Sequence, residues 1–166
     1  MRKEWTIDKS RSAIHVKARS TLHDSKSVGT LSGTVQGDPD SLESTAGGTV
    51  DIPIGDFDFG NRLQTSAVLS KLDVDKYPMA RFRVDGVRVL SKSPWRVQIL
   101  GKLDYRNRQT SFEVEATGRF DERTLDASAS FPLNLPSIGV KPPSLLFFKV
   151  ADDVQIDLKI VATRQA

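Results

Sequence analysis

Residues 125–133 read Leu125-Asp126-Ala127-Ser128-Ala129-Ser130-Phe131-Pro132-Leu133. Every second side chain in this stretch is apolar, and the residues between them are polar except for the proline. Because a β-strand directs successive side chains to opposite faces, the pattern predicts a strand with one apolar face and one wet face.

The same period of two recurs along most of the chain. Clear examples are Ile14, Val16 and Ala18; Val50, Ile52 and Ile54; Val97, Ile99, Gly101 and Leu103; and Val154, Ile156, Leu158 and Ile160. The connections between these runs are short and rich in Gly, Asp, Asn, Ser and Pro, which favours antiparallel pairing of about eight to ten strands. A sheet of that length tends to curl until its edges meet, so we expect an all-β antiparallel barrel.

One segment, residues 61–73, departs from this period. It contains no Gly or Pro, and its apolar residues recur three or four apart, on one broad helical face: Leu63, Ala67, Val68, Leu69 and Leu72. Asn61 is a suitable N-cap, and Pro78 ends any continuation. We therefore expect one helix of about three turns.

Length and charge limit the classes of function. The 166 residues suit a single domain, residues 1–166, with one core. The net charge of +3 comes from Lys and Arg spread along the sequence, so a nucleic-acid partner is not expected. A transient contact with anionic membrane surfaces stays open.

The cellular compartment is not decided by the sequence. The absence of cysteine excludes disulfides and thiolate metal sites, but it suits either redox environment. No apolar stretch approaches the length of a membrane span, and no apolar leader follows Met1. We expect a periplasmic or secreted protein if a leader was removed, and a cytoplasmic protein if Met1 is the native start.

Residues typical of catalysis or metal binding are scarce. His15 and His23 are the two histidines, and neither has a second histidine or a carboxylate nearby at the spacing of metal ligands. Known nucleotide-binding and nucleophile motifs are missing, and most carboxylates fall in turns or on the wet faces of strands. We therefore predict no catalytic residues, no bound metal and no cofactor.

Several residues expected to face the barrel interior are small: Ala18, Gly33, Gly101, Ala116, Gly118, Ala127 and Ala129. A barrel of about eight strands can be filled by its own side chains or can hold one slender ligand, depending on the size of the inward residues. Small residues could leave an apolar tunnel unfilled, or they could mark tight strand crossings in a packed core. The residues alone leave both readings open.

Four segments of the chain match the motifs of a known protein family. The chain opens with Trp5-Thr6-Ile7-Asp8 followed by Ser12-Ala13-Ile14, and Phe57-Asp58-Phe59-Gly60-Asn61 precedes the expected helix. The most specific motif is Leu72-Asp73-Val74-Asp75-Lys76-Tyr77-Pro78 followed by Arg81-Phe82, and the fourth segment is the ending, residues 138–150. The first three segments resemble motifs of the YceI-like, polyisoprenoid-binding proteins, and the ending resembles the tail of one branch of that family. The resemblance covers nearly the whole chain in the family's order.

The resemblance implies a single lipocalin-like antiparallel barrel of about eight strands, with one short helix near the barrel mouth. It also implies non-covalent binding, storage or transport of a long-chain lipid, such as an isoprenoid quinone, a polyisoprenoid or a fatty-acid derivative. The alternative is a structural or protein-interaction barrel with a filled core, which would self-associate, for instance as a homodimer.

We assign the ligand-binding residues on this basis. The tunnel wall is expected to consist of Ile14, Val16, Val35, Val50, Ile52, Phe82, Val97, Ile99, Phe112, Val114 and Phe131, with Leu146 and Phe148 lining or closing it. At the entrance we expect Leu63, Ala67 and Leu69 from the helix, flanked by Phe59 and Tyr77.

Overall fold

The computed structural model describes residues 2–20, 24–142, 144–145 and 148–164, without the side chains of residues 144–145 and 148–149. In chain order its strands are β1 (Lys3–Ile7), β2 (Ala13–Ser20), β3 (Ser25–Gly29), β4 (Ser32–Gly37), β5 (Gly47–Pro53), β6 (Met79–Lys92), β7 (Trp95–Tyr105), β8 (Arg108–Phe120), β9 (Thr124–Asn134), β10 (Ser144–Leu145) and β11 (Phe148–Thr163).

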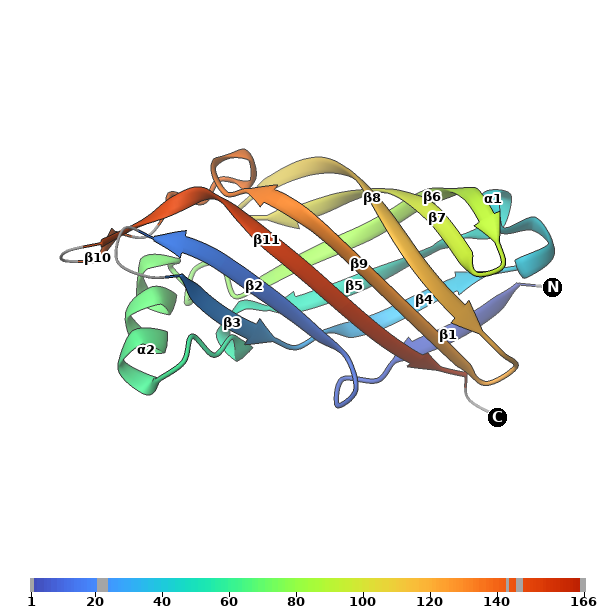
Figure 1. Cartoon of the computed structure of the whole chain (residues 1–166), viewed down its shortest axis with the longest axis horizontal. Helices are drawn as coiled ribbons and strands as arrows, with labels where there is room; N and C mark the ends of the chain where they lie inside the picture. The colour runs from blue at the N-terminus through green and yellow to red at the C-terminus, as the bar shows by residue number, and fades with distance from the viewer. Residues whose placement is uncertain (1, 21–23, 143, 146–147, 165–166) are drawn as a thin grey trace.

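The strands form a closed barrel (Figure 1). Antiparallel neighbours follow the order β1-β4-β5-β6-β7-β8-β9-β11, and pairing of β11 with β1 completes the ring. Strand β2 pairs with the part of β11 that β1 does not reach, and β3 pairs with β2. Strand β10 pairs only with β11. The eight-stranded antiparallel barrel expected from the sequence is confirmed.

A break between β1 and β2 is bridged by a serine side chain. Strand β11 pairs with β1 through Ala162 and Thr163 and with β2 from Lys159 back to Val150. Between these two ladders, the Ser12 hydroxyl donates to the Val161 carbonyl at 3.2 Å and accepts from the Val161 N–H at 2.9 Å. The buried hydroxyl thus replaces the main-chain hydrogen bonds that the break would otherwise remove.

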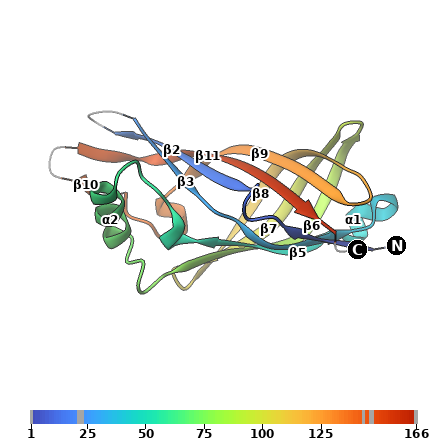
Figure 2. The ribbon, with the colours of Figure 1, turned by 90° about the horizontal axis from the view of Figure 1, so that it is seen from below.

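The predicted helix is present as α2 (Arg62–Lys71), at one end of the barrel (Figures 1 and 2). The Asn61 side chain caps it by accepting from the Gln64 N–H at 2.8 Å. Its buried residue is Val68, whereas Leu63 is 86% exposed, so the expectation that Leu63 leans on the barrel is wrong. Leu63 and Val68 are five positions apart, which turns Leu63 about 140° around the helix from Val68.

The opposite end of the barrel carries a second, shorter helix, α1 (Leu42–Thr45), which follows the 3₁₀ turn η1 (Pro39–Ser41) (Figure 2). A long-range hydrogen bond holds it, because the Glu43 carboxylate accepts from the Val89 N–H of β6 at 2.9 Å. This helix was not predicted from the sequence. Two more 3₁₀ turns, η2 (Ile54–Asp56) and η3 (Pro136–Ile138), follow β5 and β9.

The end of the barrel near α2 is packed with apolar side chains. Buried residues here come from η2, η3, the end of β7 and the nearby loops, and they form the part of the core at this end: Ile54, Phe57, Tyr105, Ile138 and Val140. The barrel therefore has a filled end beneath α2.

Candidate functional site

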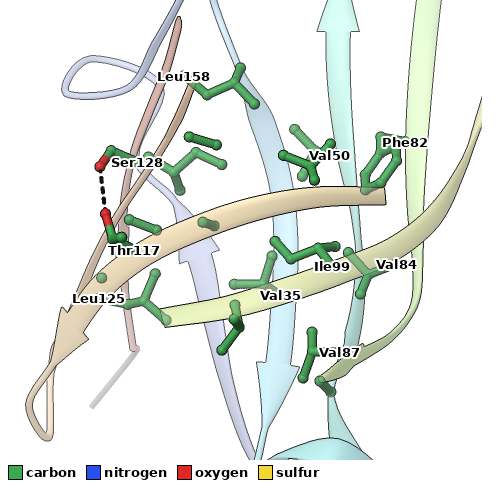
Figure 3. Close-up of a pocket in the computed structure, with 18 of the residues that line it drawn as sticks. Val35, Val50, Phe82, Val84, Val87, Ile99, Thr117, Leu125, Ser128 and Leu158 are labelled. Carbon is green, nitrogen blue, oxygen red and sulfur yellow. Dashed lines mark hydrogen bonds between the residues drawn. The ribbon is translucent and has the colours of Figure 1, made fainter. Parts of the chain in front are cut away.

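A cavity of about 310 Å³ lies inside the barrel toward the end that carries α1. Side chains from strands on all sides of the ring point into it, as Figure 3 shows for Val35, Val50 and Ile99. Helix α1 and turn η1 contribute Leu42 and Pro39, while α2 contributes no residue. The exposed surface of the cavity is almost entirely carbon.

Most of the predicted wall residues meet in this one cavity. Those that line it are Ile14, Val35, Val50, Ile52, Phe82, Val97, Ile99, Phe112, Val114 and Phe131. They come from strands far apart in sequence, and the period of two was sufficient to identify their inward direction.

The residues expected at the entrance lie elsewhere. Phe59, Leu69 and Tyr77 are half-buried and pack against the buried core, as does Val16 of β2, and none of the four lines the cavity. Leu69 also borders a surface hollow beside α2, which Phe57 and Thr65 line as well. Because α2 covers the filled end, its half-buried Ala67 and exposed Leu63 do not reach the cavity either.

The two predicted residues near the C-terminal strand remain predictions. Leu146 lies outside the described residues. Phe148 begins β11, and its side chain is outside the description as well.

Small residues on β8 and β9 form part of the wall of the barrel cavity. Ala116 pairs with Ala129, and Gly118 pairs with Ala127, so four small residues face the cavity side by side. At Ala116, Ala127 and Ala129 a methyl group occupies little of the barrel interior, and larger side chains there would fill the space. At Gly118 an added Cβ would lie 2.6 Å from the Asp126 carbonyl oxygen, so this glycine serves the close approach of β8 and β9.

The two other glycines expected to leave space have different roles. At Gly101 an added Cβ would lie 2.4 Å from Cζ of Phe82, whose ring already covers the position. Gly33 has a φ of +124°, and a Cβ there would lie 2.2 Å from the Thr49 carbonyl oxygen. At these positions the small residue serves close packing, which was the alternative left open.

An aromatic group near α1 completes the lining and was not among the predicted site residues. The ring centroids of Trp5 and Phe120 are 6.2 Å apart, and those of Trp95 and Phe120 are 5.6 Å apart. All three residues line the cavity. Trp5 begins the first alternating run with Ile7, and that pattern could have placed it inside.

Charged groups with perturbed titration lie outside the cavity. The hydroxyl of Ser130 lowers the pKa of Asp157, and the Lys17 ammonium 3.4 Å away acts in the same direction. The carboxylate of Asp51, 2.6 Å from the Arg81 guanidinium, raises the pKa of that arginine. Such pairs on the outer face leave the cavity suited to apolar contact rather than to proton transfer.

Over the residues that the structure describes, there is no group of three or more His, Asp or Glu side chains able to hold a metal ion. Within the same residues, no helix has the length and apolar character needed to cross a membrane. The carbon surface of the cavity suits the burial of an apolar molecule.

Residues 5–162 match the family profile of the YceI-like domain. Among curated proteins there is no match.

Solved structures with the same fold cover nearly the full chain. Burkholderia cenocepacia BcnA has a TM-score of 0.82 and 21% sequence identity, over 95% of this chain and 99% of that chain. A polyisoprenoid binding domain from Saccharophagus degradans, implicated in plant cell wall breakdown, has a TM-score of 0.75 and 10% identity, over 97% of this chain and 98% of its own. The Campylobacter jejuni YCEI protein has a TM-score of 0.66 and 14% identity, over 82% of each chain.

Proposed function

The chain belongs to the YceI-like domain family, and from that premise we propose that it binds one long-chain apolar lipid, without a covalent bond, inside the barrel. The ligand class is an isoprenoid quinone, a polyisoprenoid or a fatty-acid derivative. The protein then serves as a carrier or store, and it is not an enzyme.

The cavity is the observation that supports this proposal most directly. It lies inside the ring of strands, its volume is about 310 Å³, and its surface is almost entirely carbon. Water in such a space finds few hydrogen-bond partners, whereas an alkyl or isoprenoid chain loses none. The Saccharophagus degradans domain, which has the same fold, is a polyisoprenoid binding domain, and this supports the same ligand class here.

The free energy available favours a long chain. Each CH₂ group removed from water contributes roughly 0.8 kcal/mol, so about ten buried carbons would contribute roughly 8 kcal/mol before the cost of ordering the chain. A cavity with so little polar surface offers the head group no comparable gain. Selectivity inside the barrel should therefore follow chain length and shape.

Extraction and titration test the proposal. Organic extraction of protein purified without detergent, followed by mass spectrometry, should yield a long-chain lipid. The extracted protein should then bind geranylgeraniol, and the binding should change the fluorescence of Trp5 and Trp95, the only tryptophans in the chain, because both line the cavity. A barrel that yields no lipid and binds neither geranylgeraniol nor palmitate would refute the proposal.

A variant that fills the cavity provides a matched test. Val97 lines the cavity from β7, so Val97→Trp should reduce lipid occupancy by at least about tenfold while the barrel remains folded. Leu63→Trp adds the same side chain at an exposed position on α2 and should leave occupancy unchanged. Equal occupancy in the two variants would contradict the assignment of the site to this cavity.

The second candidate is a barrel that has no ligand and acts through its surface. The packed end beneath α2 agrees with a filled core, but the space near α1 does not. Sedimentation of the lipid-free protein distinguishes the two, because only the second candidate requires self-association.

A further inference from the structure

Strands β8 and β9 pair over only part of their length. Their ladder runs from Phe120↔Leu125 to Ala116↔Ala129 and ends there. In contrast, β8 pairs with β7 as far as Tyr105↔Arg108, and β9 pairs with β11 as far as Asn134↔Asp153. In the part of the chain that the structure describes, residues 111–115 of β8 and 130–133 of β9 therefore have no strand partner on their facing edges. We call this gap the β8–β9 window.

The polar side chains beside the window bond away from it. On β8, Glu113 accepts from the Gln98 amide of β7 at 3.1 Å, and Glu115 lies 3.2 Å from the Arg96 guanidinium of the same strand. On β9, the Ser130 hydroxyl donates to Asp157 of β11. These interactions fix each strand to its other neighbour, so they hold the two window edges without joining them.

Both ends of the window are closed. At the hairpin end the hydroxyls of Thr117 and Ser128 are 3.2 Å apart, as Figure 3 shows. At the other end the Arg108 guanidinium donates to the carbonyls of Pro136 and Ser137 in η3, at 3.3 and 3.4 Å. Residues 111–115, which form the β8 side of the window, span four residue steps, or about 14 Å along the strand.

The sequence of β9 also suits an edge that stays unpaired. Pro132 lies in the window and has no N–H to donate. Prolines within sheets are confined to edges, and β9 is paired with β11 on its other side through this residue. The main-chain N–H group that Pro132 lacks is therefore missing from the edge of β9 that faces β8.

The window opens directly onto the cavity. Its inward-facing residues are Phe112 and Val114 on β8 and Phe131 and Leu133 on β9, and all four line the cavity. The cavity surface itself is carbon, whereas the two strand edges carry unpaired main-chain N–H and C=O groups that need partners.

We propose that the lipid crosses the barrel wall at the β8–β9 window, with its chain in the carbon-lined cavity and its polar end bonded to the unpaired main-chain groups of β8 and β9. The inference rests on the proposed lipid binding and adds the route and the place of the polar end. The strand edges offer both main-chain N–H donors and C=O acceptors, and the carboxylates of Glu113 and Glu115 lie beside them. These groups suit a neutral polar end on the lipid, such as a hydroxyl or a carbonyl.

Two engineered disulfides test the route. The chain has no cysteine, so Glu115→Cys with Ser130→Cys introduces one cross-link, one residue pair beyond the end of the ladder. The matched control is Arg83→Cys with Lys102→Cys, which joins β6 and β7 at a pair that is already in the ladder and does not line the cavity. If oxidation does not form a disulfide between the two cysteines, a short bifunctional thiol reagent links them instead.

Uptake and release of geranylgeraniol are followed by stopped-flow fluorescence of Trp5 and Trp95, with palmitate as a charged comparison. The window cross-link should slow both rates at least about tenfold, reduction should restore them, and the control cross-link should change neither. Amides of residues 111–115 should also exchange more slowly with deuterium in the loaded barrel, since some of them then donate to the lipid.

The outcomes separate the two proposals. If the native chain binds no long-chain lipid at all, the proposed function fails and the window with it. If it binds but the window cross-link leaves the rates unchanged, the window alone is overturned. Unchanged amide exchange, or tighter binding of palmitate than of the alcohol, would overturn the placement of the polar end.

Discussion

Two isoleucines distinguish the filled part of the barrel from the hollow part. Ile54 is buried in the core cluster beneath α2, whereas Ile99 of β7 borders the cavity. In lipid-free protein, Ile54→Ala should lower the free energy of unfolding by about 3 kcal/mol, because it opens a new void. Ile99→Ala should cost about half as much, because the side chain already has empty space beside it. Urea unfolding measures both values, and equal losses would contradict a hollow near Ile99.

Asp8 gives the turn between β1 and β2 a measurable dependence on pH. Its carboxylate accepts from the Ser10 hydroxyl at 2.7 Å and from the Arg11 guanidinium at 2.7 Å, and these contacts lower its pKa from 3.8 to about 2. Folding therefore favours the ionised form. The resulting stability is fully present above the unfolded pKa and is lost as the pH falls from about 4 to about 2.

Asp8→Asn tests this assignment by comparison with the native chain. The variant should be less stable at about pH 6, and the difference in free energy of unfolding should shrink as the pH falls to about 2. Other carboxylates with lowered pKa values are present in both proteins, so their contributions cancel in the difference. A difference that is independent of pH would mean that the Asp8 charge does not stabilise the turn.

Single residues also show how far the sequence could predict the site. Ala129 and Gly101 both fall at inward positions, yet only Ala129 lines the cavity, because the Phe82 ring covers Gly101. The period of two gives the direction of a side chain, but it does not say which neighbour fills the space in front of it. The size of a cavity depends on those neighbours, which only the folded structure brings together.

Among the elements, helix α2 is held to the barrel mainly at its C-terminal end. The Arg106 guanidinium donates to the Leu72 carbonyl at 2.8 Å and lies 4.5 Å from the centroid of the Tyr77 ring. Arg106→Lys keeps the positive charge but loses the planar guanidinium, which makes both the hydrogen bond to Leu72 and the contact with the Tyr77 ring. We expect a loss of about 1–2 kcal/mol in the free energy of unfolding, with faster amide exchange at the end of α2.

The control for this variant is Arg83→Lys on the outer face of β6, whose guanidinium lies 2.9 Å from the Asp104 carboxylate. Because both groups are largely exposed to water, this substitution should change stability by less than about 0.5 kcal/mol. Similar effects from the two substitutions would show that the contacts of Arg106 do not hold α2.

The elements differ in how clearly the sequence announced them. Helix α2 was predictable because Asn61 supplies a cap and the ten residues after it contain no Gly or Pro. Helix α1 has four residues, which is too short for a helical period to appear. The early end of the β8–β9 ladder was also hidden, because β9 shows unbroken alternation through Leu133 and register between strands is not a local property.

In the whole molecule, the barrel is divided between a packed end and a hollow end. The resemblance to its family predicted one lipocalin-like barrel correctly, but the alternation of single strands could not predict which end would be filled. The filling at the α2 end comes from irregular segments, namely η2 and η3 with Phe57 and Val140. These segments have no period from which their inward direction could be read.

This division predicts how lipid affects the stability of the whole barrel. A ligand that binds only the folded state stabilises it by RT ln(1 + [L]/Kd), which is about 2.7 kcal/mol when the free ligand is 100 times Kd. Geranylgeraniol should therefore raise the Tm of extracted protein by several degrees, increasing with ligand concentration. Calorimetry should show one transition, because strands from the hollow end continue into the packed end and must unfold with it.

Val97→Trp is the control that ties this stabilisation to the cavity. Its added side chain occupies the space that the lipid would take, so the Tm of the variant should not respond to geranylgeraniol at any concentration. A response equal to that of the native chain would place the lipid on the outer surface, where the exposed apolar side chains Leu63, Met79 and Leu90 are the available contacts. Because the hollow end gains the lipid's contacts while the packed end is already complete, amide protection should rise most in β7 and β8.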